Sequence, residues 1–217
     1  MKKFRISSHF LLWGMILLMG GCAGRPHYSL VPDYTVKPPR SIAVLPAQNE
    51  TVSLKAPEEF RPLVHSIIAA KGYETLGIAD IDKKLQGKGI REAGQIHSLT
   101  PQELGKLLGV DAVLYTTVTE FSTAYLLAYA SMTVGARFEL KDAKTGEKLW
   151  ESEHRVTESK VGLDKKAMEE SAKFAALQAY APYNQKVADA CFATLPDGPL
   201  STPPRPKAGC LFPGGRK

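Results

Sequence analysis

The sequence lacks an apolar run of the length that a membrane-spanning helix requires, which is about 20 residues. The apolar run near its start, from Phe10 to Met19, has ten residues and is followed by two glycines. Basic residues precede this run, and no acidic residue stands before Cys22. A positive start, a short apolar core and small residues before a cleavage point are typical of a secretory signal peptide. Residues 1–21 are therefore predicted to export the chain and to be removed, not to anchor it.

The sequence also lacks the common motifs of enzymes and metal sites. It contains no Gly-x-Ser-x-Gly elbow, no His-Glu-x-x-His pair and no phosphate-binding loop. The four histidines after residue 21 lie in different predicted elements and form no pair with metal-ligand spacing: His27, His65, His97 and His154. Asp80 and Asp82 are close in sequence, but stabilising the start of a helix explains them better than acid–base work. We therefore predict no catalytic residue, no cofactor and no metal.

An excess of basic charge is missing from the part of the chain that is expected to fold. The whole chain has a formal net charge of +6, but this excess lies in the signal peptide and in the segment after Cys191. Residues 22–191 hold 21 basic and 21 acidic residues. Nucleic-acid binding calls for basic residues clustered on one face. The sequence therefore predicts no nucleic-acid partner.

The end of the signal peptide contains one of only three cysteines. The sequence Met19-Gly-Gly-Cys22 resembles the lipobox of bacterial lipoproteins, although that pattern prefers leucine where this chain has Met19. The resemblance implies that Cys22 is the lipidated N-terminus of the mature protein, with acyl chains such as palmitate; ordinary cleavage with a free Cys22 is the alternative. Two or more acyl chains give stable membrane anchoring. The same resemblance implies the outer membrane, because Ala23 stands where an aspartate would favour inner-membrane retention.

The two remaining cysteines are Cys191 and Cys210. Export to an oxidising compartment permits a disulfide, and we predict that these two residues pair. Closing a proline-rich loop of this size contributes about 3 kcal/mol in the chain-entropy estimate. A redox function is the alternative, but the Cys-x-x-Cys spacing is absent.

Apolar periodicity predicts a single α/β domain over residues 41–191. We expect a flexible tether over residues 22–40, which has prolines but no helical or strand period, and a proline-rich tail over residues 192–217. The predicted order is β-α-β-α-α-β-β-β-α, with a mixed sheet that includes an antiparallel hairpin. Strands are predicted over residues 41–46, 73–79, 111–121, 132–141 and 150–156, and helices over residues 57–72, 80–85, 100–109 and 164–181.

Local signals mark where several helices begin or end. In the sequence Leu99-Thr-Pro-Gln-Glu-Leu104, Thr100 is the expected N-cap and Glu103 completes a capping box. Asp80 is predicted to cap the preceding helix. Pro182 is predicted to stop or kink the last helix.

Short motifs in a fixed order make the chain similar to a family of bacterial lipoproteins of unassigned function. These motifs are Ser41-Ile-Ala-Val-Leu-Pro46, Lys71-Gly-Tyr73, Gly109-Val-Asp-Ala-Val-Leu-Tyr115, Val118-Thr-Glu120, Asp142, Thr145-Gly-Glu-Lys-Leu-Trp150 and Leu195-Pro-Asp-Gly-Pro199. The resemblance implies a fold like the periplasmic domain of the curli-secretion lipoprotein and the amino-terminal domain of the Tol-system translocation protein. It also implies an outer-membrane lipoprotein with a curli-secretion-like lipoprotein as a partner.

Together these observations predict a lipid-anchored protein of the outer membrane whose domain faces the periplasm. Its expected role is a non-enzymatic binding or assembly factor for other envelope proteins in envelope biogenesis or secretion. The alternatives are a subunit of an oligomeric curli-type secretion channel and an enzyme acting on the cell wall, for which Glu120 is the acidic candidate. The uncharged segment 124–132 is either a buried strand or crossing loop, or an exposed patch for a partner or for self-association.

Overall fold

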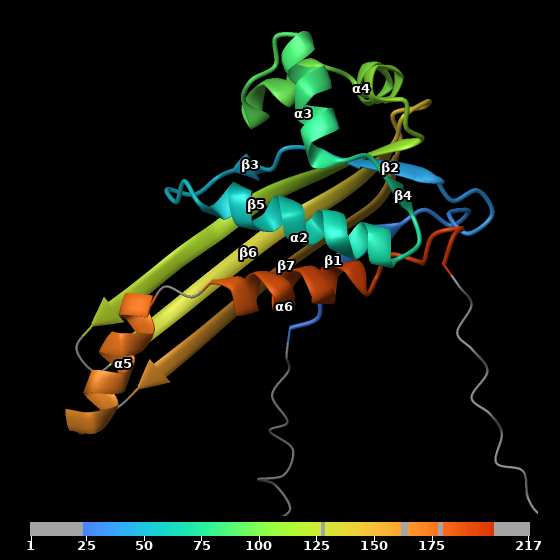
Figure 1. Cartoon of the computed structure of the whole chain (residues 1–217). Coiled ribbons are helices and arrows are strands. Elements are labelled where there is room, and N and C mark those ends of the chain that lie inside the picture. Colours follow the sequence, from blue (N-terminus) through green and yellow to red (C-terminus); the bar gives the residue numbers. More distant parts are fainter. Residues whose placement is uncertain (1–23, 127–128, 162–164, 178–179, 202–217) are drawn as a thin grey trace, which may run out of the picture.

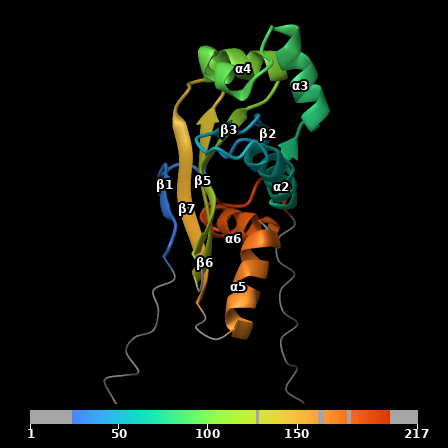
Figure 2. The same cartoon turned by 90° about the vertical axis from the view of Figure 1, so that its left-hand side faces the viewer.

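The computed structural model describes residues 24–126, 129–161, 165–177 and 180–201. They form one mixed sheet of seven strands with helices packed against it (Figure 1, Figure 2), which confirms the predicted α/β class. The strands are β1 His27–Leu30, β2 Ser41–Val44, β3 Gln48–Asn49, β4 Glu74–Thr75, β5 Ala112–Leu126, β6 Tyr129–Asp142 and β7 Lys148–Val161. The helices are α2 Ala56–Ala70, α3 Ile78–Gly87, the 3₁₀ helix η1 Ala93–Ser98, α4 Pro101–Leu108, α5 Lys165–Leu177 and α6 Ala181–Phe192.

The sheet combines a short parallel part with a long antiparallel part. Its strand order is β1-β7-β6-β5-β2-β4, and β3 pairs with β5. Strand β2 is parallel to β4 and β5, whereas β6 is antiparallel to both β5 and β7. From β2 onward the predicted order holds, with β3 as an extra short strand. The helix predicted over residues 164–181 corresponds to α5, which ends at Leu177. Helix α6 was not predicted, and Pro182 lies in its first turn.

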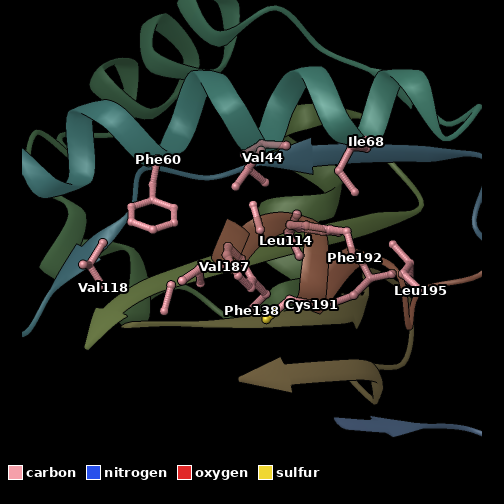
Figure 3. Close-up of a cluster of buried hydrophobic side chains, with 14 of the residues drawn as sticks. Val44, Phe60, Ile68, Leu114, Val118, Phe138, Val187, Cys191, Phe192 and Leu195 are labelled. Atoms are coloured by element: carbon pink, nitrogen blue, oxygen red, sulfur yellow. The ribbon is translucent and has the colours of Figure 1, made fainter. Parts of the chain in front are cut away.

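The hydrophobic core occupies both faces of the parallel part of the sheet. Val44 and Leu114 point to the face that α2 and α6 cover (Figure 3), where Phe60 and Phe192 pack against the strands. The neighbouring residue Ala43 faces the opposite cluster, which α3 and α4 cover. Strands buried on both faces must be apolar at every position. This explains why β2 appears in the sequence as a continuous apolar run.

The start of α4 follows its sequence prediction, whereas the start of α3 does not. The Thr100 hydroxyl accepts a hydrogen bond from the Glu103 backbone N–H at 3.2 Å, and the Glu103 carboxylate accepts one from the Thr100 backbone N–H at 2.7 Å. The predicted N-cap role of Asp80 is wrong, because α3 already begins at Ile78 with Gly77 as its N-cap. Asp80 lies in the first turn, where a carboxylate still interacts favourably with the helix dipole.

The prediction of a flexible tether over residues 22–40 is wrong from His27 onward. Strand β1 pairs with β7, and the side chain of Tyr34 is 2% exposed. The Tyr34 hydroxyl lies 2.8 Å from the Tyr73 hydroxyl inside the domain. A four-residue edge strand is too short to show a clear period, so the sequence pattern did not reveal it.

The folded unit also extends beyond the predicted boundary at residue 191. Leu195 is 2% exposed and belongs to the main hydrophobic cluster. The Gly198 backbone N–H donates to the Lys71 carbonyl at 2.7 Å, and the Lys71 ammonium lies 2.7 Å from the Asp197 carboxylate. The described part of the predicted tail is therefore held against the turn that follows α2.

Two helical glycines should respond in opposite directions to alanine. A Cβ on Gly105 of α4 would overlap the Ala143 side chain in the turn between β6 and β7. We expect Gly105→Ala to lower the free energy of unfolding by about 1–3 kcal/mol, the usual cost of overpacking. A Cβ on Gly87, the last residue of α3, would have no heavy atom within 4 Å, so Gly87→Ala should stabilise by about 0.5–1 kcal/mol. Urea unfolding of both variants checks this; equal shifts would show that Gly105 is not in tight contact.

Candidate functional site

Strands β5, β6 and β7 continue past the rest of the sheet as a three-stranded projection (Figure 1). We call this projection the arm and define it as residues 120–126, 129–135 and 155–161. Strand β3 pairs with β5 no further than Val118, and β1 pairs with β7 no further than Glu153. Within the described part of the chain, no strand therefore pairs with the outer edge of β5 or of β7 in the arm.

One face of the arm is packed and the other is open. The aromatic ring of Phe121 stacks on that of Tyr180 with centroids 3.9 Å apart, and the Thr123 hydroxyl lies 2.6 Å from the Tyr180 hydroxyl. Met132 and Val134 are buried on this same face. Helix α5 runs beside the arm (Figure 2). The open face and the strand edges are therefore the parts of the arm that are left for a partner.

The open face carries small hydroxyl side chains and ends in an apolar row. Ser122, Thr133 and Thr157 lie opposite one another across the three strands, with a 3.1 Å hydrogen bond between the two threonine hydroxyls. The last row is formed by residues that are 72%, 40% and 69% exposed: Leu126, Tyr129 and Val161. Exposed apolar side chains that lie together on a surface indicate a binding site more strongly than isolated ones do.

Within the segment 124–132, some residues are buried and others are exposed, so each of the two predicted alternatives applies to part of it. Ala130 and Met132 are buried, as expected for a core strand, whereas Tyr125, Leu126 and Tyr129 are exposed, as expected for a patch. The segment turns from β5 into β6 at the end of the arm, and residues 127 and 128 lie outside the described residues.

Glu120 has a structural partner. It lies at an irregularity in the pairing of β5 with β6, and its carboxylate is 3.3 Å from the guanidinium of Arg155 on β7. The two side chains meet across Gly135, where an added Cβ would approach the Glu120 Cβ to 3.3 Å. The ion pair agrees with the structural alternative for Glu120, and Gly135 leaves the room that the pair needs.

Three other acidic or histidine candidates from the sequence also make structural contacts. The Asp82 carboxylate lies 2.7 Å from the Arg61 guanidinium. His65 lies 3.0 Å from the Leu76 carbonyl, and His97 lies 2.8 Å from the Gln48 side chain. Among residues 24–126, 129–161, 165–177 and 180–201, no group of three or more His, Cys, Asp or Glu side chains is placed to hold a metal ion. No helix in these same ranges is both long and apolar enough to cross a membrane.

Of the three cysteines predicted to be lipidated or disulfide-bonded, the structure describes only Cys191. Cys22 and Cys210 lie outside the described residues, so both assignments remain predictions. Cys191 has no exposed surface and packs in the core between α6 and the sheet (Figure 3), and it forms no disulfide with a described residue. Burial raises the pKa of this thiol to about 12. The described residues thus give no support for the Cys191–Cys210 bond, and Cys191 serves as a core side chain.

The sequence and the fold of the chain have counterparts in known proteins. The family model described as "Putative lipoprotein GNA1162-like" matches residues 31–181, which is more than half of the chain. The chain belongs to the GNA1162-like lipoprotein family. A curated relative, "Putative lipoprotein NMB1124/NMB1162" of Neisseria meningitidis serogroup B, is 31% identical over 129 residues. The match covers 58% of this chain and 60% of that relative's length.

A solved structure agrees with this membership of the GNA1162-like family. The crystal structure of lipoprotein GNA1162 from Neisseria meningitidis has a TM-score of 0.54 and 27% identity, and the match covers 64% of this chain and 97% of that one. A dodecamer of PelC from Paraburkholderia phytofirmans gives a TM-score of 0.40 at 15% identity, covering 73% of this chain and 96% of that chain. The PelC similarity is too distant to assign an activity or an oligomeric state to this chain.

Proposed function

We propose that this lipoprotein is a non-enzymatic binding or assembly factor of the outer membrane, held there by acyl chains on Cys22 and facing the periplasm. The proposed partners are other envelope proteins, which the arm binds through the outer edge of β5. Membership of a lipoprotein family supports the anchor. The unpaired edge of β5 is the single observation that carries the binding role.

The edge of β5 lacks the devices that usually protect a free strand edge. Natural sheets protect such edges with lysine, with proline, with bulges or with a covering element. From Phe121 to Leu126 the strand contains no charged residue and no proline, and its only irregularity lies before Phe121. The opposite edge, on β7, carries Arg155, Glu158 and Lys160. An unprotected edge beside a protected one supports the addition of a strand from a partner at β5.

Photo-crosslinking in cells tests this function. A photoreactive amino acid at Ser122, which is exposed, should give a discrete adduct with an envelope protein. Ala124→Lys should reduce this adduct about tenfold, equivalent to about 1.4 kcal/mol, because a charge on the edge opposes strand addition. Ser159→Lys is the matched control, since Ala124 and Ser159 are exposed and lie in the same row on opposite edges of the arm. An adduct that is equally sensitive to both lysines, or no adduct at all, would contradict binding at β5.

Self-association is a second candidate function, favoured by the presence of two free edges on one element. Strands β5 and β7 point in the same direction, because each is antiparallel to β6. The β5 edge of one copy and the β7 edge of the next would form a heterologous contact, which can repeat to build a ring or a filament. In the same crosslinking experiment this function predicts adducts at multiples of the mass of the chain, and both lysine substitutions would reduce them.

A further inference from the structure

The end of the arm combines apolar side chains with positive charge. Four of its residues are substantially exposed and belong to all three strands: Tyr125 at 49%, Leu126 at 72%, Tyr129 at 40% and Val161 at 69%. The one charged residue in the last three rows of the arm is Lys160, and the first acidic residue, Glu158, lies one row further back. We call the last two rows, residues 125–126, 129–130 and 160–161, the tip.

Helix α5 begins beside the tip, four residues after the end of β7. Lys166, in its first turn, is exposed. Figure 2 shows α5 running alongside the arm with its start at the same end as the tip. An apolar surface bordered by lysines suits the boundary between lipid headgroups and acyl chains, where the lysines attract anionic lipids and the tyrosines lie at headgroup level.

The position of β1 sets how far the arm can be from the membrane. His27 pairs with Glu153, and β1 is antiparallel to β7, so the chain enters β1 from the side on which the arm projects. Cys22 is five residues before His27, a distance of at most about 18 Å. Val161 is eight residues beyond Glu153 along β7, a distance of about 26 Å. Val161 therefore lies farther from the level of His27 than Cys22 can reach.

We propose that the tip inserts into the lipid interface and forms a second membrane attachment next to the acyl chains of Cys22. This inference rests on the lipidation included in the proposed function, but it does not require a protein partner. With the acyl chains in the bilayer, an arm directed at the membrane reaches the interface before the segment from Cys22 to His27 is fully extended. The β5 edge behind the tip stays in water and remains open to a protein.

Tryptophan fluorescence of the full lipidated chain tests the insertion. Leu126→Trp and the control Val36→Trp both replace exposed residues, the latter 74% exposed in a turn beyond β1. Each variant is reconstituted in vesicles of phosphatidylethanolamine and phosphatidylglycerol with brominated acyl chains, and the signal of the parent chain is subtracted. We expect a blue-shifted and quenched emission for Leu126→Trp and neither change for Val36→Trp. The reference sample is the Leu126→Trp variant made in the unlipidated Cys22→Ser chain and measured in buffer without vesicles or detergent. If its emission spectrum equals that of the lipidated Leu126→Trp chain in vesicles, the proposal is overturned.

A second measurement separates lipid binding from an effect on folding. The unlipidated Cys22→Ser chain should bind the same vesicles weakly, and Leu126→Glu should reduce that binding at least tenfold, whereas Val36→Glu should not. Both sites are exposed, so circular dichroism should be unchanged. Equal binding of the two glutamate variants would show that the tip does not contact lipid. The crosslink at Ser122 should persist in Leu126→Glu, so failure of this proposal and failure of the proposed function give different results.

Discussion

The Cys22→Ser chain is expected to move completely from the membrane fraction to the soluble fraction while its domain stays folded. Each buried acyl CH₂ contributes about 0.8 kcal/mol, and two or three acyl chains hold a protein on a bilayer where one holds it only marginally. A tip of four exposed apolar side chains cannot replace that contribution. The described core is formed by residues from Leu30 onward, so the far-ultraviolet circular dichroism should not change.

Fractionation of cells on a density gradient provides the measurement and its control. The parent chain should sediment with the outer membrane, and Cys22→Ser should not sediment. Ala23→Asp is the matched control, because it keeps the cysteine and should move the protein to the inner membrane if the lipoprotein sorting implied by the signal sequence applies. A Cys22→Ser chain that still sediments with the outer membrane would show that the domain is held there by a protein or by the arm and not by lipid.

The elements of the fold that the sequence revealed are those with a strong local cause. The capping box of Thr100 and Glu103 and the uninterrupted apolar strand β2 each depend on neighbouring residues, and both are present in the structure. Strand β1 depends on pairing with Glu153 and its neighbours more than a hundred residues away, so its own sequence carries little signal. Cys191 likewise packs against strands that are distant in the sequence, so its local sequence does not reveal that its side chain lies in the core.

The arm could be predicted in part. The uncharged segment 124–132 lies in the arm, but periodicity could not decide between burial and exposure, because the two faces of the strands differ in what covers them. Tyr180 and α5 cover one face, and both follow the arm in the sequence. The free edge of β5 depends on where β3 ends, which is a property of the whole sheet. Strand edges are therefore visible only once the pairing is known.

Phe192→Ala is expected to cause the largest loss of stability among the substitutions considered, about 3–5 kcal/mol. Phe192 is 2% exposed, and its ring centroid lies 4.9 Å from that of Phe138 and 5.3 Å from that of Trp150. Removing the ring leaves a cavity between α6 and the sheet and removes two aromatic contacts. Domains are commonly stable by only 5–15 kcal/mol, so the variant should be close to unfolding at growth temperature.

Urea unfolding of the Cys22→Ser chain, followed by circular dichroism, measures this effect without detergent. The control is Leu54→Ala, which also shortens an apolar side chain but at a residue that is 86% exposed, and it should change the free energy of unfolding by less than about 0.5 kcal/mol. Helix α6 begins at Ala181, where the match to the family ends. A small effect of Phe192→Ala would therefore mean that the family-matched region folds without α6. A loss of several kcal/mol would mean that the domain requires residues beyond that region to close its core.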